Sequence, residues 1–322
     1  MRKIFLAFFA SAALVCPGSQ LTFAADKIRI AVANFNVSFM TAGVAAKKGY
    51  FRDEGLEPEI IGMRPPVSIT ALASGDIDYT TVFGSVVRAA VRGLPVRVVA
   101  SWIDGSTHAL IARPEFKTVK DLRGKTMGVG SYGASDDIAG RMMVKHYGVD
   151  PDKQMKVVAL GPDRARFAAL KEGIVDVAVI APPMDSEGRK AGFNILARAY
   201  EIFTFPFVGL GTNTKKLSEK PDEVRRTLKA FIRANRFIRD NREESIQILT
   251  AWGRTDRNSA TAAYDAAVKV FNADGTIPES GLRLVLEQAR SEANISREVA
   301  VSEVADLTLL REAQRELGTK GK

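Results

Sequence analysis

The sequence has 322 residues, a formal net charge of +9 and a single cysteine, Cys16. A chain of this length is too long for one small hydrophobic core and suits one large domain or two of medium size. The positive charge is compatible with nucleic acid, with an anionic surface or with an anionic ligand, and the compartment decides among them.

The first residues predict export from the cytoplasm. A basic Arg2-Lys3 pair is followed by an apolar run at residues 4–15, and Thr22-Phe23-Ala24 places small residues where a signal peptidase reads them. A membrane span would need about 20 apolar residues, and Pro17 ends the run too early. Residues 1–24 are therefore interpreted as a signal peptide.

Cleavage is expected after Ala24, with Ala25 as the neighbouring alternative, and leaves 298 of the 322 residues with a charge of +7. Lipid attachment at Cys16 is the competing interpretation, but such signals place a small residue before the cysteine and here it is Val15. Loss of Cys16 with the signal excludes disulfides, thiol catalysis and thiolate-bound metal. Export to the periplasm also makes nucleic acid an unexpected partner.

Short apolar strands alternate with helical stretches in the first part of the exported chain. Strands are predicted at residues 27–33, 57–61, 78–82 and 96–101, and helices at residues 38–48, 67–74 and 85–92. Strands that alternate with helices of about ten residues favour β-α-β units on a largely parallel sheet.

The same pattern starts again after an interruption at Arg113-Pro114. Extended segments are predicted at residues 108–112, 126–129, 156–160, 175–180 and 205–212, and helical ones at residues 119–122, 135–147 and 164–172. This is a second α/β unit of about 100 residues.

The tail from Pro221 onward is mostly helical. Leu228, Phe231, Ile232, Asn235 and Ile238 repeat at a spacing of three to four and predict one buried helix face. Residues 215–242 contain ten Lys and Arg against four Asp and Glu, which predicts either a solvated basic face or a contact with anionic lipid or a partner.

Two α/β units joined by extended crossings predict two lobes with a cleft between them. In open α/β sheets ligands bind beyond the carboxyl ends of the strands, and two crossings can act as a hinge. The crossings are predicted at residues 112–114 and 208–212. They divide the chain into a first lobe of residues 25–112 with 211–322 and an inserted second lobe of residues 113–210.

Four motifs carry a resemblance to a known family. In chain order they are residues 48–56 (KGYFRDEGL), 71–78 (ALASGDID), 121–125 (DLRGK) and 168–176 (AALKEGIVD). Their order and spacing over residues 27–215 resemble the nitrate/sulfonate/taurine-type periplasmic binding proteins of ABC transporters, also described as SsuA/THI5-like or NMT1-like, which include binders of thiamine precursors. Gly49, Gly75 and Gly173 would end helices in these motifs.

The resemblance implies a type II periplasmic-binding-protein fold with two Rossmann-like lobes, a hinge, a central cleft and a helical C-terminal tail. It also implies a receptor for an ABC importer, with a small-molecule ligand, a permease and its ATPase as partners. Catalytic residues, cofactors and metals are not expected, and the protein is expected to be a monomer. The ligand is expected to be a small anionic, aromatic-acid or sulfonate-type solute.

The candidate ligand-binding residues follow the predicted strands. Ser135 is expected to cap a helix whose free N–H groups suit an oxyanion, Gly133 to allow close approach, and Arg64 to pair with the anion. The full set is Asn34, Phe35, Asn36, Arg64, Pro65, Phe83, Gly84, Ser85, Trp102, Ser131, Tyr132, Gly133, Ala134, Ser135, Pro182, Pro183 and Met184.

Residues 181–184 depart from the sulfonate-binding relatives. The resemblance implies a tryptophan and an aspartate before the second proline, and this chain has Ala181 and Pro182 there. A polar anchor is therefore missing, which argues against taurine or simple alkanesulfonates as the ligand.

Other chemistry is not favoured by the sequence. Residues 128–133 (GVGSYG) match a dinucleotide-binding motif, but the acid about 20 residues on, Asp150, falls in a turn rather than at the end of a strand. Two histidines, His108 and His146, are too few for a histidine-rich metal site, and Asp136-Asp137 are interpreted as charges near a helix start. The cysteine cluster of the pyrimidine-synthesising enzymes with this fold is absent. Two alternatives to an import receptor remain, a periplasmic sensory subunit and an enzyme.

Overall fold

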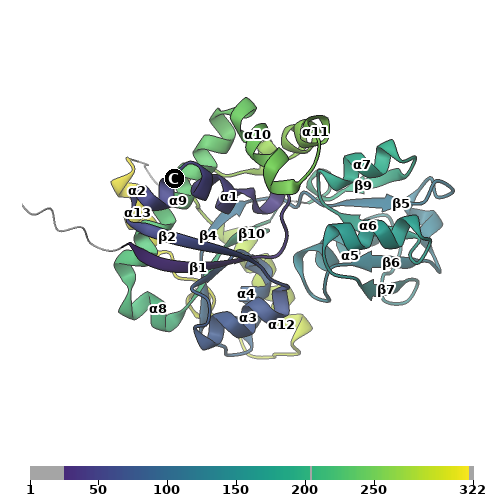
Figure 1. Ribbon diagram of the computed structural model, residues 1–322. Helices are drawn as coiled ribbons and strands as arrows, with labels where there is room; N and C mark the ends of the chain where they lie inside the picture. Colours follow the sequence, from purple (N-terminus) through teal and green to yellow (C-terminus); the bar gives the residue numbers. More distant parts are fainter. Residues whose placement is uncertain (1–24, 204, 319–322) are drawn as a thin grey trace, which may run out of the picture.

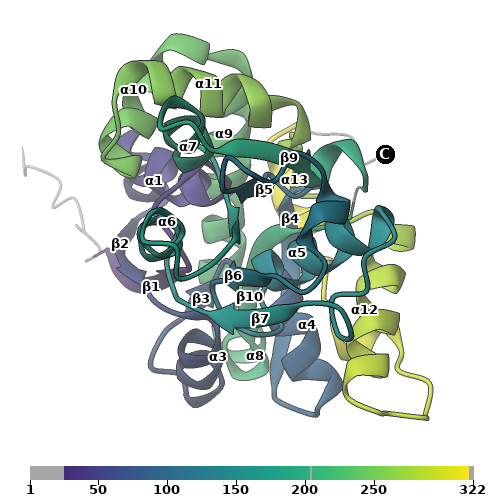
Figure 2. The same ribbon diagram turned by 90° about the vertical axis from the view of Figure 1, so that its right-hand side faces the viewer.

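The computed structural model describes residues 25–203 and 205–318, so the predicted signal peptide lies outside the described residues. Two α/β units lie side by side, each with its own five-stranded sheet (Figure 1). The first unit contains the beginning and the end of the described chain, and the second unit contains the middle, drawn in teal. Seen from the end of the molecule, the second unit lies in front of the first (Figure 2).

The first sheet has the strand order β2-β1-β3-β10-β4. Strand β1 pairs in parallel with β2 and β3, and β10 pairs antiparallel with β3 and β4. Its strands are β1 (Asp26–Val32), β2 (Leu56–Gly62), β3 (Tyr79–Thr80), β4 (Val96–Ile103) and β10 (Val208–Asn213).

The second sheet repeats this plan in the order β7-β6-β8-β5-β9. Strand β6 pairs in parallel with β7 and β8, and β5 pairs antiparallel with β8 and β9. Its strands are β5 (Ala109–Ala112), β6 (Thr126–Val129), β7 (Lys156–Ala159), β8 (Val177–Ile180) and β9 (Asn194–Arg198). Each sheet therefore has three neighbouring parallel strands, then one antiparallel strand, and then a fifth strand that runs in the direction of the first three.

The crossings between the units differ from the predicted ones. Strand β5 belongs to the second sheet and β10 to the first, so the chain crosses at residues 104–108 and returns at residues 199–207. The predicted crossings at 112–114 and 208–212 each fall on or beside a strand. The apolar sequence of β5 predicts a strand. It does not predict which sheet the strand joins, because the pairing of β5 with β8 depends on how the whole second unit folds.

The helices connect and cover these strands. They are α1 (Met40–Lys47), α2 (Tyr50–Asp53), α3 (Pro65–Ser74), α4 (Phe83–Val91), α5 (Ser135–His146), α6 (Asp163–Lys171), α7 (Met184–Lys190), α8 (Thr214–Glu219), α9 (Pro221–Asp240), α10 (Arg242–Gly253), α11 (Arg257–Ala267), α12 (Glu279–Glu292) and α13 (Thr308–Glu316). The predicted strands and helices all coincide with structural elements, whereas α2, α7, α8 and β9 were not predicted. Within residues 25–203 and 205–318, no helix has the length and hydrophobicity needed to cross a bilayer.

The family motifs have plain structural roles. Gly49, Gly75 and Gly173 adopt positive φ angles of 76°, 87° and 71°, as their helix-ending role requires. Phe51, which follows the first of them, is buried and lies edge-on to Phe231 of α9 with ring centroids 5.5 Å apart.

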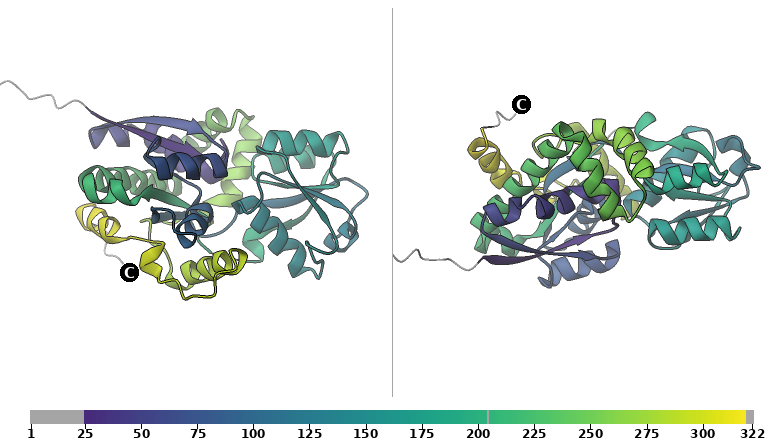
Figure 3. Two further views of the ribbon diagram at one scale, coloured as in Figure 1. Left: turned by 90° about the horizontal axis from the view of Figure 1, so that it is seen from below. Right: turned by 45° about the horizontal axis from the view of Figure 1, so that its top comes forward.

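The C-terminal helices pack on the first unit (Figure 3). In α9 the predicted apolar face is buried, and Asn235 within it donates hydrogen bonds to the carbonyl oxygens of Trp102 and Asn272, both at 2.8 Å. Three cations of the basic face pair with acids of other elements of the protein. Arg226 meets Asp26 at 2.6 Å, Lys229 meets Glu54 at 2.9 Å and Arg233 meets Asp53 at 2.8 Å.

These pairs reduce the part of the basic segment that is free, but they contradict neither a solvated basic face nor a contact with anionic lipid or a partner. The cations of α9 lie against acids of β1, α2 and the turn after α2, so much of the local positive charge serves contacts between elements rather than a free basic surface. Exposed pairs of this kind contribute only about 0–1 kcal/mol each, so the buried face does most to hold α9 in place.

Trp102 tests the core of the first unit. Its side chain is completely buried and stacks on Phe231 with ring centroids 5.2 Å apart. We expect Trp102→Ala to lower the free energy of unfolding by about 3–5 kcal/mol, because the cavity cannot be refilled without rearranging α9. Chemical denaturation measures the change.

The matched control is Leu284→Ala on the exposed surface of α12. Leu284 is half exposed, so its removal should change the free energy of unfolding by no more than about 0.5 kcal/mol. Equal losses for the two variants would contradict the assignment of Trp102 to the core.

Candidate functional site

The carboxyl ends of the parallel strands in both units face one another across a cleft. Loops after β1 and β2 line it on one side, and loops after β6, β7 and β8 line it on the other. The cleft contains three adjoining pockets. We call them the central pocket (around Arg64 and Ser131), the tryptophan pocket (around Phe35 and Trp252) and the Arg88 pocket (around Ser85 and Arg88).

The central pocket takes residues from both units. The first unit contributes Ala33, Asn34, Asn36, Phe39, Arg64 and Pro65, and the second contributes His108, Gly130, Ser131, Ser135, Asp136, Gly161, Pro162 and Arg166. The space that they enclose in this arrangement is only about 40 Å³. This is room for a few water molecules, so a solute needs the lobes to separate or side chains to shift before it can bind.

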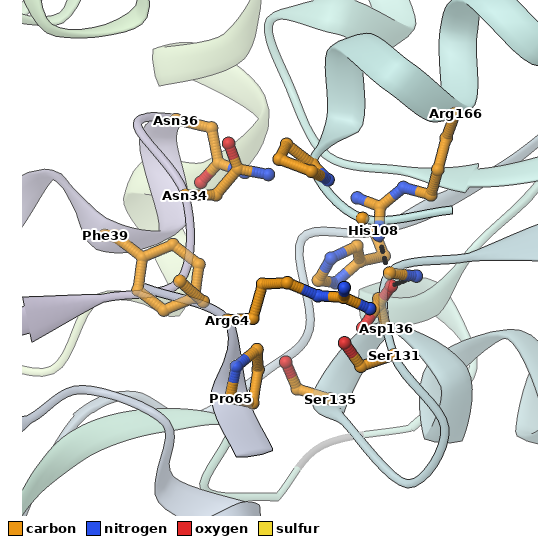
Figure 4. Close-up of a pocket in the computed structure, with 14 residues that line it drawn as sticks. Asn34, Asn36, Phe39, Arg64, Pro65, His108, Ser131, Ser135, Asp136 and Arg166 are labelled. Carbon is orange, nitrogen blue, oxygen red and sulfur yellow. Dashed lines mark hydrogen bonds and ion pairs between the residues drawn. The ribbon is translucent and has the colours of Figure 1, made fainter. Parts of the chain in front are cut away.

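Arg64 extends from the first unit into the central pocket. It caps the start of α3 in an extended conformation, and Pro65 and Pro66 fix the backbone that follows. Figure 4 shows its guanidinium reaching towards Ser131, His108 and Asp136 of the second unit. Among the described residues, the guanidinium of Arg64 has no hydrogen-bond or ion-pair partner. An unpaired guanidinium at such a place can bind a carboxylate, sulfonate or phosphate through two parallel hydrogen bonds.

Ser131 and Ser135 face Arg64 across the pocket (Figure 4). They stand just before and at the start of α5, whose N-terminal end carries a partial positive charge. The prediction that Ser135 caps this helix is wrong, because Ala134 occupies the cap position and Ser135 is the first helical residue. The hydroxyl groups nevertheless lie where they can donate to an anion.

A buried charge cluster forms the wall behind these serines. Arg166 of α6 pairs with both Asp136 of α5 and Asp163, and all three side chains are nearly inaccessible to solvent. Burial by itself would lower the pKa of Arg166, but the two carboxylates outweigh burial and raise it. Asp136 also accepts a hydrogen bond from the backbone N–H of Gly130.

Asp163 of this cluster also joins the two units. The side-chain amides of Asn34 and Asn36 donate hydrogen bonds to it at 2.8 and 2.6 Å. A second contact lies close by, where the backbone N–H of Val37 donates to the carbonyl oxygen of Pro182 at 3.3 Å. The two asparagines therefore act first as links between the units, and they reach the ligand space at the edge of the central pocket.

His108 lies at the end of the crossing at residues 104–108. Its ring is buried, contacts Phe207, and has its Nδ1 atom 3.1 Å from the hydroxyl oxygen of Ser106. Burial lowers the pKa of His108, although nearby Asp136 and Asp163 act in the opposite direction. The residue therefore lines the pocket as a neutral imidazole.

The tryptophan pocket lies on the other side of the asparagine links. Phe35 lies edge-on to Trp252 with ring centroids 4.7 Å apart, and Pro183 and Met184 line the opposite wall. Arg164 closes the pocket by donating to the carbonyl oxygens of Gly253 and Arg254 at 3.0 and 2.7 Å. Because those carbonyls end α10, the cation stands at the negative end of a helix.

The structure divides the predicted ligand-binding residues into three groups. Those in the central pocket are Asn34, Asn36, Arg64, Pro65, Ser131 and Ser135. Those in the neighbouring pockets are Phe35, Pro183, Met184, Ser85, Tyr132 and Gly133. Those that line none of the three pockets are Phe83, Gly84, Trp102, Ala134 and Pro182.

Phe83 and Trp102 are corrected here, because both side chains are completely buried in the core of the first unit. Each follows or ends a strand, but its side chain turns away from the cleft. Four further residues line the central pocket and were not predicted to do so: Phe39, His108, Asp136 and Arg166. The position of Asp136 next to a glycine-rich loop was a usable signal, whereas nothing local marked Arg166.

The glycine motif at residues 128–133 is explained by packing. A Cβ atom on Gly130 would lie 2.5 Å from both Arg166 and Asp136, so only glycine fits beside the charge cluster. Asp150 lies in a turn, where it accepts the backbone N–H groups of Asp152 and Lys153. Within the described residues there is also no group of three His, Cys, Asp or Glu side chains that could hold a metal ion.

His108 supports a prediction about pH. A histidine in the unfolded chain titrates near pH 6.5. As the pH falls below that value, the unfolded state takes up a proton that folded His108 resists, so the stability that neutral His108 contributes above this pH is lost. We expect His108→Gln to lose stability less steeply than the wild type between about pH 7 and pH 5 in denaturation measured at several pH values.

His146→Gln is the control for this experiment, because His146 lies on the exposed surface of α5. It should keep the wild-type pH profile. An unchanged profile for His108→Gln would show that the imidazole is not protected from protonation.

Comparison with known proteins finds a matching family model and relatives of similar sequence. Residues 36–245 match the model of the family described as "NMT1/THI5 like". The riboflavin-binding protein RibY of Chloroflexus aurantiacus is 27% identical over 223 residues, which cover 66% of this chain and 62% of RibY. The 4-amino-5-hydroxymethyl-2-methylpyrimidine phosphate synthase THI5 of Saccharomyces cerevisiae is 27% identical over 215 residues, which cover 61% of this chain and 62% of THI5.

Solved structures give the fold. The periplasmic sulfonate-binding protein SsuA of Methylobacillus flagellatus, which its description assigns to a sulfonate ABC transporter, superposes with a TM-score of 0.70 at 18% identity. The match covers 92% of this chain and 96% of SsuA, so the expected periplasmic-binding-protein fold is confirmed. Since the family model spans more than half of the sequence, this chain belongs to the NMT1/THI5-like family.

Proposed function

We propose that this protein is a periplasmic solute-binding receptor of an ABC importer and that it binds a small anionic solute in the central pocket. The observation that carries the proposal is Arg64, an unpaired cation that reaches across the cleft towards Ser131 and Ser135 at the start of α5. Family membership and the likeness to SsuA support it, as do the N-terminal residues typical of an exported protein.

The two units would act as the lobes of this receptor. The crossings at residues 104–108 and 199–207 would form the hinge, and the asparagine links to Asp163 would stabilise the closed form. A ligand that contacts Arg64 on one lobe and Ser131 on the other favours closure, because it gains both contacts only when the lobes meet. The closed form would then engage a permease with its ATPase.

The charge distribution of the central pocket argues for an anion. Its acids are already neutralised in part, because Asp136 and Asp163 share Arg166. Arg64 retains its hydrogen-bonding capacity, whereas Phe39 and Pro65 supply an apolar surface for the body of the solute. A small carboxylic or aromatic acid fits these properties.

Two other functions remain to be separated from import. The yeast relative is named as a synthase, so catalysis must be tested by following consumption of candidate ligands by the purified protein. Ser106, which lies beside His108, is completely buried and cannot reach a solute as a nucleophile in this arrangement. A sensory subunit would have the same cleft. It would be identified by a membrane kinase, rather than a permease, that binds the closed form.

A substitution of Arg64 tests the proposed function directly. We expect a panel of organic acids to contain ligands that raise the melting temperature, and Arg64→Gln to weaken their binding about tenfold or more because a charge-assisted pair is lost. Calorimetry measures both effects. Arg257→Gln, an exposed arginine of α11, should bind as the wild type does.

If no acid in a broad panel shifted the melting temperature, the receptor proposal would fail. Equal losses for Arg64→Gln and Arg257→Gln would point to a general effect of charge instead.

Arg164 tests the closing motion. Arg164→Ala removes the two hydrogen bonds to the end of α10, so the ligand-free protein should populate the open form more strongly. Small-angle X-ray scattering should then show a larger radius of gyration without ligand and the wild-type value at saturating ligand. Arg283→Ala, which breaks only a surface pair with Glu279, should leave both values unchanged.

A further inference from the structure

The Arg88 pocket contains a second cation that the protein does not neutralise well. Arg88 belongs to α4, and only 7% of its side chain is exposed. Neither Nη1 nor Nη2 has a hydrogen-bond partner among the described residues. Burying a guanidinium without partners is costly, so a group that supplies the missing acceptors would bind favourably.

The acids near Arg88 do not fill this role. The nearest carboxylate oxygen, on Glu292 of α12, lies 3.7 Å from Nη1, beyond a normal hydrogen bond. Asp137 is already occupied, because it accepts the backbone N–H of Gly133 at 2.7 Å and pairs with Arg141 at 2.7 Å. The guanidinium therefore has an attractive field around it but no direct acceptor.

The surroundings of Arg88 belong to both units. Ser85 lies one turn before it on α4 and faces the same pocket, together with Tyr132 and Gly133 from the second unit. A Cβ atom on Gly84 would lie 3.5 Å from Nη2, and one on Gly133 would lie 3.6 Å from Nε. The loop of the second unit thus covers the guanidinium, and it would expose Arg88 when the lobes separate.

The Arg88 pocket also adjoins the central pocket, since Pro65 lines both of them. Arg64 immediately precedes this proline. The two arginines therefore stand on either side of one proline at the same lobe edge, each in a pocket completed by the other lobe.

We infer that the natural solute carries two acidic groups, of which Arg64 binds one and Arg88 with Ser85 binds the other. This rests on the proposed function, because it names the class of solute for the same cleft. The solute enters the open form, its second acid reaches Arg88 before the loop at Tyr132 and Gly133 closes over it, and closure then buries both ion pairs. A monoacid leaves Arg88 unsatisfied and binds more weakly.

Pairs of a monoacid and a diacid with similar carbon skeletons separate the diacid proposal from the receptor proposal. Calorimetry would compare butyrate with succinate, hexanoate with adipate, and benzoate with isophthalate. At least one diacid should bind about tenfold or more tightly than its monoacid partner. Arg88→Gln should remove that advantage, and Arg88→Lys should restore part of it.

Arg92→Gln is the control variant, because Arg92 is an exposed arginine one turn further along α4 that lines the same pocket. It should keep most of the diacid preference. Circular dichroism and melting temperature would show that each variant is folded, and Glu292→Gln offers a test that leaves Arg88 intact. Removing that competing acid should strengthen diacid binding.

The outcomes are distinct. Diacids that bind no more tightly than monoacids, or an equal loss of preference in Arg88→Gln and Arg92→Gln, would overturn the assignment of Arg88 while the receptor function stands. Failure of all these acids and of the broader panel to bind would remove the proposed function itself.

Discussion

The closed arrangement of this protein depends on the shared carboxylate of Asp163. From its own unit it pairs with Arg166, and from the other unit it accepts hydrogen bonds from Asn34 and Asn36. A buried carboxylate needs a cation and several donors, and here the donors come from both sides of the cleft. Opening the cleft would therefore replace the two amide donors with water, while the pair with Arg166 remains.

The same principle explains which charges remain for a ligand. The acids of the cleft are satisfied by Arg166, by backbone N–H groups and by the asparagines, whereas Arg64 and Arg88 lack hydrogen-bonding partners among the described residues. The acids thus contribute to contacts across the cleft, and the two arginines are the cations proposed to bind the solute. An anionic ligand completes the electrostatics of the closed form, and a cationic one would meet no free acid in this cluster.

Several cations outside the cleft are also paired with acids of the protein. The positive net charge suggested an external anionic partner, yet the cations of α9 pair with acids of β1 and α2 within the first unit. Net charge describes the whole surface, but a basic helix face can be covered by neighbouring acids once the chain is folded. The cations proposed to bind the ligand are two arginines in the cleft, whereas these cations of α9 join elements of the first unit.

The sequence alone determined the elements. The alternation of apolar runs and turn residues predicted the strands and helices of both units up to residue 180, apart from the short α2, because local hydrophobic periodicity and helix-ending glycines are properties of neighbouring residues. It also located the strand-end loops that carry Arg64 and Ser131, since ligand sites on parallel sheets lie at those ends.

Only the tertiary structure decided how these elements pair. Strand β5 joined the second sheet rather than the first, Phe83 and Trp102 turned into the core, and Asn34 met an acid 129 residues further along the chain. The cations of the cleft could not be told from surface arginines in the sequence. Burial is a property of the assembled molecule, and it distinguishes Arg88 from its exposed neighbour Arg92.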